Sequence, residues 1–145
     1  MNFANPSREE IRALLERSRT IAVVGLSDDP ARPSYGVTRA MQRFSYRIVP
    51  VNPTLEQWQG LPAYADLDAA VRGSPEPIDI VNVFRRSEYL PDVVRDAAAV
   101  KAGAVWAQLG VEHRDAITIA QDADMPLVMD RCIKVEYMRL GIERV

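Results

Sequence analysis

A short apolar segment, Ile21–Val24, leads directly into a loop of small, polar and cationic residues, Gly25–Ser34. Glycine permits a tight turn, the hydroxyls of Ser27 and Ser34 can donate hydrogen bonds, and the Arg32 guanidinium can grip phosphate oxygens in a fork. Apolar residues follow the loop at helical spacing, so we predict a helix with Ser34 as its N-cap. Helix N-termini attract anions through their free N–H groups and dipole. The segment therefore predicts an anion site that suits a diphosphate.

The loop departs from the common glycine-rich nucleotide motifs. Ser27 stands where G-x-G-x-x-G has its second glycine, and no lysine follows in the manner of G-x-x-x-x-G-K-[ST]. These departures weaken the case for NAD, FAD or nucleoside triphosphate hydrolysis. Gly25 alone is equally consistent with a purely structural turn, and Arg32 with a rigid surface loop, but the strand–loop–helix context favours ligand contact by Arg32 and Ser34.

Two further segments restrict which nucleotide the chain could bind. NAD-binding folds place an acidic residue after the second strand, whereas this chain has Asn52 and Pro53 there. Asparagine would not repel a phosphate on the ribose, as a carboxylate would. Phe84, Arg85 and Arg86 follow the third apolar run and offer an apolar wall and cations, although one of these arginines is expected to form only a surface ion pair. An adenosine with an extra phosphate fits this corner better than NAD does.

The elements that position these residues are five short apolar runs whose starts lie 23 to 30 residues apart. Most are apolar at successive positions, as in parallel strands buried on both faces, and each gap has room for a helix. The alternation predicts an α/β, Rossmann-like, doubly wound parallel five-stranded sheet in three α/β/α layers, with strand order 3-2-1-4-5. The five runs are Ile21–Val24, Ile48–Val51, Ile78–Phe84, Ala104–Leu109 and Leu127–Met129.

We predict a single domain over residues 1–145. An N-terminal helix is expected within residues 1–19, the core over 20–130, and a C-terminal helix and tail over 131–145. Ser7 and Glu10 have the spacing of a capping box at the start of the first helix. Ser87 is expected to cap a later helix. The stretch between the second and third apolar runs is predicted to consist mainly of loops. Ligands bind beyond the carboxyl ends of such strands, so the loops there are the candidate site.

Composition excludes several function classes. A formal charge of −2 and a pI near 5.4 give no general attraction for nucleic acid or an anionic membrane. No signal peptide is recognisable and no apolar run approaches the ~20 residues that span a bilayer, so we expect a cytoplasmic protein with no nucleic-acid or membrane partner. One cysteine and one histidine make a disulfide framework or a zinc site improbable on composition, and no metal is predicted.

The single histidine and cysteine offer little catalytic chemistry. His113 stands near an expected helix start, where histidine is usually solvated, and no nucleophile pairs with it. Cys132 follows the last strand, where a cysteine is more often a small buried hydrophobe than a reactive thiol. Arg131 or Lys134 could stabilise the Cys132 thiolate, so a reactive Cys132 is kept as an alternative. We therefore predict no catalytic residues.

Five ordered motifs at the strand ends resemble those of the stand-alone coenzyme A-binding proteins. That family is in turn similar to the N-terminal coenzyme A-binding domain of the succinyl-CoA synthetase α subunit. The resemblance covers nearly the whole chain from the first strand onward, and it departs from the family at Ile133, where relatives commonly have proline. The motifs are Val24–Ser34, Val51–Pro53, Val83–Arg86, Gln108–Gly110 and Asp130–Cys132.

The resemblance implies a location for each part of coenzyme A. The diphosphate would lie on the Gly25–Ser34 loop, and the pantetheine arm would run toward Gln108 and Gly110. Ser27, Arg32 and Ser34 would contact the diphosphate, while Asn52, Pro53, Phe84 and Arg85 would lie near the adenosine. The phosphohistidine domain and partner subunit of the synthetase have no counterpart in 145 residues. Ligase activity of this chain alone is therefore not expected.

Three functional hypotheses follow. The leading one is a protein that binds coenzyme A or acyl-coenzyme A and is non-catalytic by itself. The second is an enzyme of acyl-coenzyme A or coenzyme A thiol/disulfide chemistry that uses Cys132. The third is a coenzyme A-sensing regulatory subunit of a larger complex. A homo-oligomer or an unidentified protein partner is left open.

Overall fold

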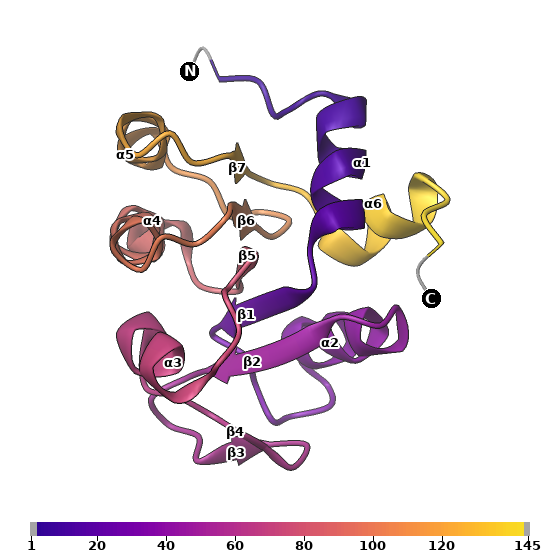
Figure 1. Cartoon of the computed structure of the whole chain (residues 1–145), viewed down its shortest axis with the longest axis vertical. Helices are drawn as coiled ribbons and strands as arrows, with labels where there is room; N and C mark the ends of the chain where they lie inside the picture. The colour runs from indigo at the N-terminus through magenta and orange to yellow at the C-terminus, as the bar shows by residue number, and fades with distance from the viewer. Residues whose placement is uncertain (1–2, 144–145) are drawn as a thin grey trace.

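The computed structural model describes residues 3–143, and five parallel strands form its central sheet. The strands pair in the order β2-β1-β5-β6-β7, with parallel register throughout (Figure 1). Each coincides with one of the five predicted apolar runs, which confirms the α/β Rossmann-like class. The strands are β1 (Thr20–Val24), β2 (Arg47–Val51), β5 (Ile80–Val83), β6 (Val105–Ala107) and β7 (Leu127–Val128).

The predicted strand order, 3-2-1-4-5, is wrong in one respect. Numbered among the five sheet strands alone, the observed order is 2-1-3-4-5, because β5 pairs with β1 and not with β2. Pro50 lies within β2 opposite Val23 of β1. Proline has no N–H to donate to a second neighbour, so a strand that contains it belongs at a sheet edge. The edge position of β2 was therefore readable from Pro50.

Helices cover both faces of the sheet, three on each side (Figure 1). Helices α3 (Leu67–Gly73), α4 (Leu90–Ala99) and α5 (Arg114–Asp122) pack on one face. Helices α1 (Arg8–Arg17), α2 (Pro33–Arg43) and α6 (Ile133–Arg139) pack on the other. A short hairpin, β3 (Gln57–Trp58) and β4 (Leu61–Pro62), precedes α3, and the 3₁₀ turn η1 (Ser87–Tyr89) precedes α4.

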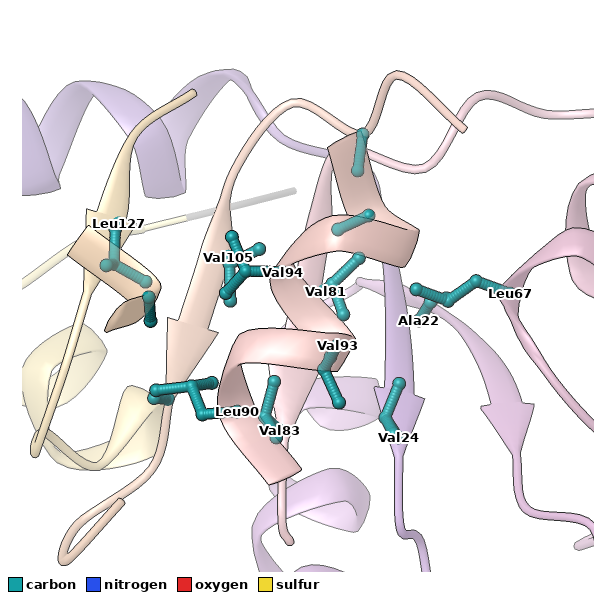
Figure 2. Packing of buried hydrophobic residues seen from close by; sticks show 14 of the residues in the cluster. Ala22, Val24, Leu67, Val81, Val83, Leu90, Val93, Val94, Val105 and Leu127 are labelled. Atoms are coloured by element: carbon teal, nitrogen blue, oxygen red, sulfur yellow. The ribbon is translucent and has the colours of Figure 1, made fainter. Parts of the chain in front are cut away.

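Alternate residues of each strand face opposite helical layers. On the α4 side, Val81 and Val83 of β5 meet Leu90, Val93 and Val94 (Figure 2). All five side chains are buried, and removal of their apolar surface from water is the main stabilising contribution here. All four residues of β5 are buried, as in a strand covered on both faces, and Asn82 is the one polar residue among them.

The predicted capping box at the start of α1 is confirmed. The Ser7 hydroxyl accepts a hydrogen bond from the Glu10 N–H at 3.1 Å, and Glu10 Oε1 accepts one from the Ser7 N–H at 2.8 Å. The latter bond lowers the pKa of Glu10 because it stabilises the carboxylate. Within residues 3–143, none of the helices combines the length and apolar character needed to cross a bilayer.

Candidate functional site

Two adjoining cavities open at the carboxyl ends of the strands. The first, here called the α2 cavity, has a volume of about 670 Å³ and the second, the α4 cavity, about 530 Å³. The α2 cavity is lined by Gly25, Ser27, Arg32, Ser34, Asn52, Phe84 and Gln108 among others. The α4 cavity is lined by Gly25, Asn52, Pro53, Phe84 and Arg85 among others. Nine of the ten predicted site residues thus line these two cavities, and Gly110 lines neither.

Gly25 is the point at which the two cavities meet. Its φ is +86°, and a Cβ atom there would lie 2.6 Å from the Phe84 carbonyl oxygen. Its N–H donates to Val51 O at 3.0 Å. β1 therefore ends without a side chain between its neighbours β2 and β5. This close approach brings Asn52 and Phe84 to the same cavities although their strands do not pair.

The two loop serines accept hydrogen bonds from loop amides. The Ser27 N–H donates to Ser34 Oγ, and the Asp29 N–H donates to Ser27 Oγ, both at 3.0 Å. A hydroxyl that accepts such a bond keeps its own proton for another acceptor. Both residues line the α2 cavity. The loop thus holds them as hydrogen-bond donors suited to an anion.

The α2 N-terminus adjoins this loop, but its cap differs from the prediction. Arg32 is the N-cap residue, Pro33 follows at N1, and Ser34 is a buried residue inside the first turn. Proline at N1 is favourable because the N–H it lacks would have no helical partner. Ser34 is consequently free of a capping role and bonds to Ser27. The first turn contains no acidic residue, although Asp28 lines the cavity nearby.

Asn52 secures the loop from the end of β2. Its Nδ2 donates to Leu26 O at 2.9 Å, while its Oδ1 accepts from both the N–H and the hydroxyl of Thr54. The amide therefore joins the loop after β1 to the loop after β2, and it adds no negative charge at the end of β2. Aspartate would lack the N–H donor for Leu26 O.

Arg85 and Arg86 have different environments. Arg86 forms an ion pair with Glu88 at 3.3 Å and donates to the Tyr89 hydroxyl at 3.1 Å. The Arg85 guanidinium lies over the Tyr89 ring, 4.1 Å from its centroid. Within residues 3–143, Arg85 has no ion pair with a carboxylate. Arg85 is thus the arginine available to an anionic ligand.

Acidic and apolar residues form the far side of the α4 cavity. Pro53, Leu67 and Val93 supply apolar surface, and Asp66 and Asp96 supply carboxylates. Burial, reinforced by repulsion from Asp92 and Asp66, raises the pKa of Asp96.

Gln108 and Gly110, which follow β6, form hydrogen bonds with other loops of the protein. Gln108 is buried, and its Oε1 accepts from the Ile133 N–H at the start of α6 at 3.0 Å. Gly110 adopts a φ of +84°, donates to Asp130 Oδ1 at 2.7 Å and accepts from the Ser87 hydroxyl. Ser87 also accepts from the Glu112 N–H, so it secures this loop and is not the N-cap of α4 that we predicted; Tyr89 has that position.

The single cysteine lines a cavity of the candidate site, whereas the single histidine caps a helix. Cys132 is half-buried, forms the N-cap of α6 and lines the α2 cavity. His113 is the N-cap of α5, where its Nδ1 accepts from the Asp115 N–H at 3.0 Å. No cluster of three or more metal-ligating side chains occurs among the described residues.

Sequence reasoning missed several residues of the site. Leu55, Val37 and Val111 add apolar lining to the α2 cavity. Trp58 lines neither cavity, yet its Nε1–H donates to Ser27 O at 3.0 Å. Leu55, Trp58 and Val111 come from segments distant from the Gly25–Ser34 loop in sequence, so no local pattern marks them; Val37 directly follows the loop in α2 and belongs to its predicted apolar spacing.

The fold and the paired cavities define the class as a Rossmann-like α/β domain built on a five-stranded parallel sheet, with its candidate site at the carboxyl edge of the strands. Residues 19–138 match the model of the CoA binding domain family. The chain belongs to this family.

Individual relatives agree with that assignment. The chain is 45% identical over 133 residues to the uncharacterized protein YneT of Bacillus subtilis (strain 168), a match that covers 92% of this chain and 96% of YneT. It is 36% identical to cell-free ID.343 from Thermus thermophilus, with a TM-score of 0.84 and coverage of 93% and 99%.

A more distant structure shares the fold alone. It is the dinucleotide-forming acetyl-coenzyme A synthetase 1 of Ca. Korarchaeum cryptofilum, at 21% identity and a TM-score of 0.64. The match covers 78% of this chain and 26% of the synthetase. The fold of this small protein thus recurs as one part of a larger synthetase.

Proposed function

We propose that this chain binds coenzyme A across the α2 and α4 cavities and is non-catalytic by itself. The observation that carries the proposal is the arrangement of donors at the α2 N-terminus. Ser27 and Ser34 keep hydroxyl protons for an anion, and Arg32 lies beside them without an acidic partner among residues 3–143. Such donors at a helix N-terminus match a diphosphate. Membership of the family supports coenzyme A as the molecule that carries it.

The α4 cavity suits the adenosine end. Apolar surface from Pro53, Leu67 and Val93 can contact the base, and the carboxylates of Asp66 and Asp96 can accept hydrogen bonds from its exocyclic amine. Arg85 lines the α4 cavity beside Gly25 and would pair with the 3′-phosphate. The pantetheine arm would then extend through the α2 cavity past Gln108 toward Cys132.

Arg32→Ala tests the diphosphate contact. Loss of a charge-assisted hydrogen bond is expected to weaken coenzyme A binding by about 1.5–3 kcal/mol in calorimetry. Arg43→Ala is the matched control, because Arg43 is an exposed arginine in the last turn of the same helix. An equal loss in both variants would show a general charge effect and remove Arg32 from the site.

A second candidate function is thiol–disulfide exchange between Cys132 and coenzyme A disulfide. It is favoured by the position of Cys132 in the wall of the α2 cavity. The Cys132 thiolate would attack one sulfur of the disulfide, forming a mixed disulfide and releasing the other coenzyme A as a thiolate that takes up a proton.

Intact-mass spectrometry after incubation with coenzyme A disulfide tests this candidate. The expected result is one coenzyme A adduct on the native protein, removed by a reductant and missing in Cys132→Ser. A native protein that stays unmodified would rule out this chemistry without affecting the binding proposal.

A further inference from the structure

Trp58 connects the β3–β4 hairpin to the Gly25–Ser34 loop. The indole is 1% exposed, and its Nε1–H donates to Ser27 O at 3.0 Å. Its ring meets Tyr35, in the first turn of α2, edge to face at a centroid distance of 5.4 Å. A second tether runs from the same hairpin, because Gln59 Nε2 donates to the Tyr35 hydroxyl at 2.7 Å. The hairpin therefore holds both the loop and the helix start.

The Trp58 bond fixes the direction of a peptide group. In a trans peptide the C=O and the N–H point in opposite directions, and the described chain has no cis peptide bond. The preceding peptide shows the rule, since Leu26 O accepts from Asn52 while the Ser27 N–H donates to Ser34 Oγ. With Ser27 O bound to the indole, the Asp28 N–H must point away from Trp58.

The Asp28 N–H is a donor that the loop itself does not use. Asp28 lines the α2 cavity, whereas Trp58 does not. The N–H groups of Ser27, Asp29, Ala31 and Arg32 all have partners within the loop or at Ser34. Within residues 3–143, the Asp28 N–H has no hydrogen-bond partner.

We propose that Trp58 is a positioning residue that orients the Ser27–Asp28 peptide so that the Asp28 N–H binds the diphosphate. This inference rests on the proposed function. Trp58 acts only through the loop, and the backbone donor at Asp28 adds to the hydroxyls of Ser27 and Ser34. The hairpin, inserted in a stretch that looked rich in loops, then has a role in ligand affinity.

The test compares Trp58→Phe with Trp106→Phe by calorimetry with coenzyme A. Phenylalanine keeps most of the ring and removes the N–H. Trp106 is the matched control, because it is equally buried and its Nε1–H donates to a different loop carbonyl, Arg131 O, at 2.9 Å. We expect Trp58→Phe to raise the Kd about three- to tenfold, and Trp106→Phe to change it by less than about twofold.

Phosphorus NMR of bound coenzyme A separates positioning from general destabilisation. In Trp58→Phe the diphosphate resonances should move from their wild-type positions, while the 3′-phosphate resonance stays in place. Unchanged diphosphate resonances, or equal movement of all three phosphorus signals, would overturn the inference. If wild-type protein binds no coenzyme A, the proposed function fails; if it binds and Trp58→Phe binds equally well, only the role of Trp58 fails.

An amide measurement on the wild-type chain keeps the test independent of variant folding. The Asp28 N–H resonance should shift strongly downfield when coenzyme A is added, as expected for a new charge-assisted hydrogen bond. An Asp28 resonance that does not respond to saturating coenzyme A would contradict the inference.

Discussion

Several residues of this site form hydrogen bonds that hold the loops in place, and the same residues line the cavities. Ser27 and Ser34 accept bonds that shape their own loop and still present protons to the α2 cavity. Asn52 joins two loops through its amide. Their residue types were recognisable as site candidates from the sequence. The bonds from Ser27 to Asp29 and from Asn52 to Thr54 are local, whereas those from Ser27 to Ser34 and from Asn52 to Leu26 depend on the fold and could not be predicted.

Gly25→Ala should damage the junction of the two cavities. A Cβ at 2.6 Å from Phe84 O together with a φ of +86° predicts a loss of about 1–3 kcal/mol in the free energy of unfolding, measured in urea. Gly36→Ala is the control, because Gly36 lies in α2 with no atom within 4 Å of its added Cβ. Alanine there should stabilise by about 0.5–1 kcal/mol. Similar effects at both positions would contradict the structural role of Gly25.

Arg85 and Arg86 are predicted to differ in ligand selectivity. Arg85→Ala should abolish most of the preference for coenzyme A over dephospho-coenzyme A, because the guanidinium over Tyr89 has no carboxylate partner among the described residues. Arg86→Ala should retain that preference, since Arg86 is paired with Glu88. Calorimetry with both ligands measures the ratio. The opposite pattern would assign the 3′-phosphate to Arg86.

At the level of elements, periodicity and caps predicted the strands and the α1 start well. The error in strand order arose because spacing alone does not tell on which side of β1 the chain returns. Pro50 carried that information, since it places β2 at the edge. The β3–β4 hairpin was missed because its strands contain two residues each and have no detectable period.

Hydrogen exchange tests the central position of β5. Amides of β1 and β5, which lie inside the sheet, should be the most protected, and those of the edge strands β2 and β7 should exchange faster. Faster exchange in β5 than in β2 would instead fit the order 3-2-1-4-5. The comparison is made in one native sample and needs no variant.

At the scale of the whole molecule, the sheet brings the loops that follow its strands to one edge. β1 leads into the Gly25–Ser34 loop, β2 into Asn52 and Pro53, β5 into Phe84 and Arg85, and β6 into Gln108. The chain belongs to the CoA binding domain family, and it shares its fold with part of an acetyl-coenzyme A synthetase. We propose that the ligand is coenzyme A, whose diphosphate, 3′-phosphate and adenine each have candidate partners among the residues that line the two cavities.

The most direct measurement is calorimetric titration of the purified wild-type chain with coenzyme A, dephospho-coenzyme A and NAD. We expect saturable binding of coenzyme A, weaker binding of dephospho-coenzyme A because the Arg85 contact is lost, and still weaker binding of NAD. NAD binding as tight as that of coenzyme A, or no binding of coenzyme A, would contradict this expectation.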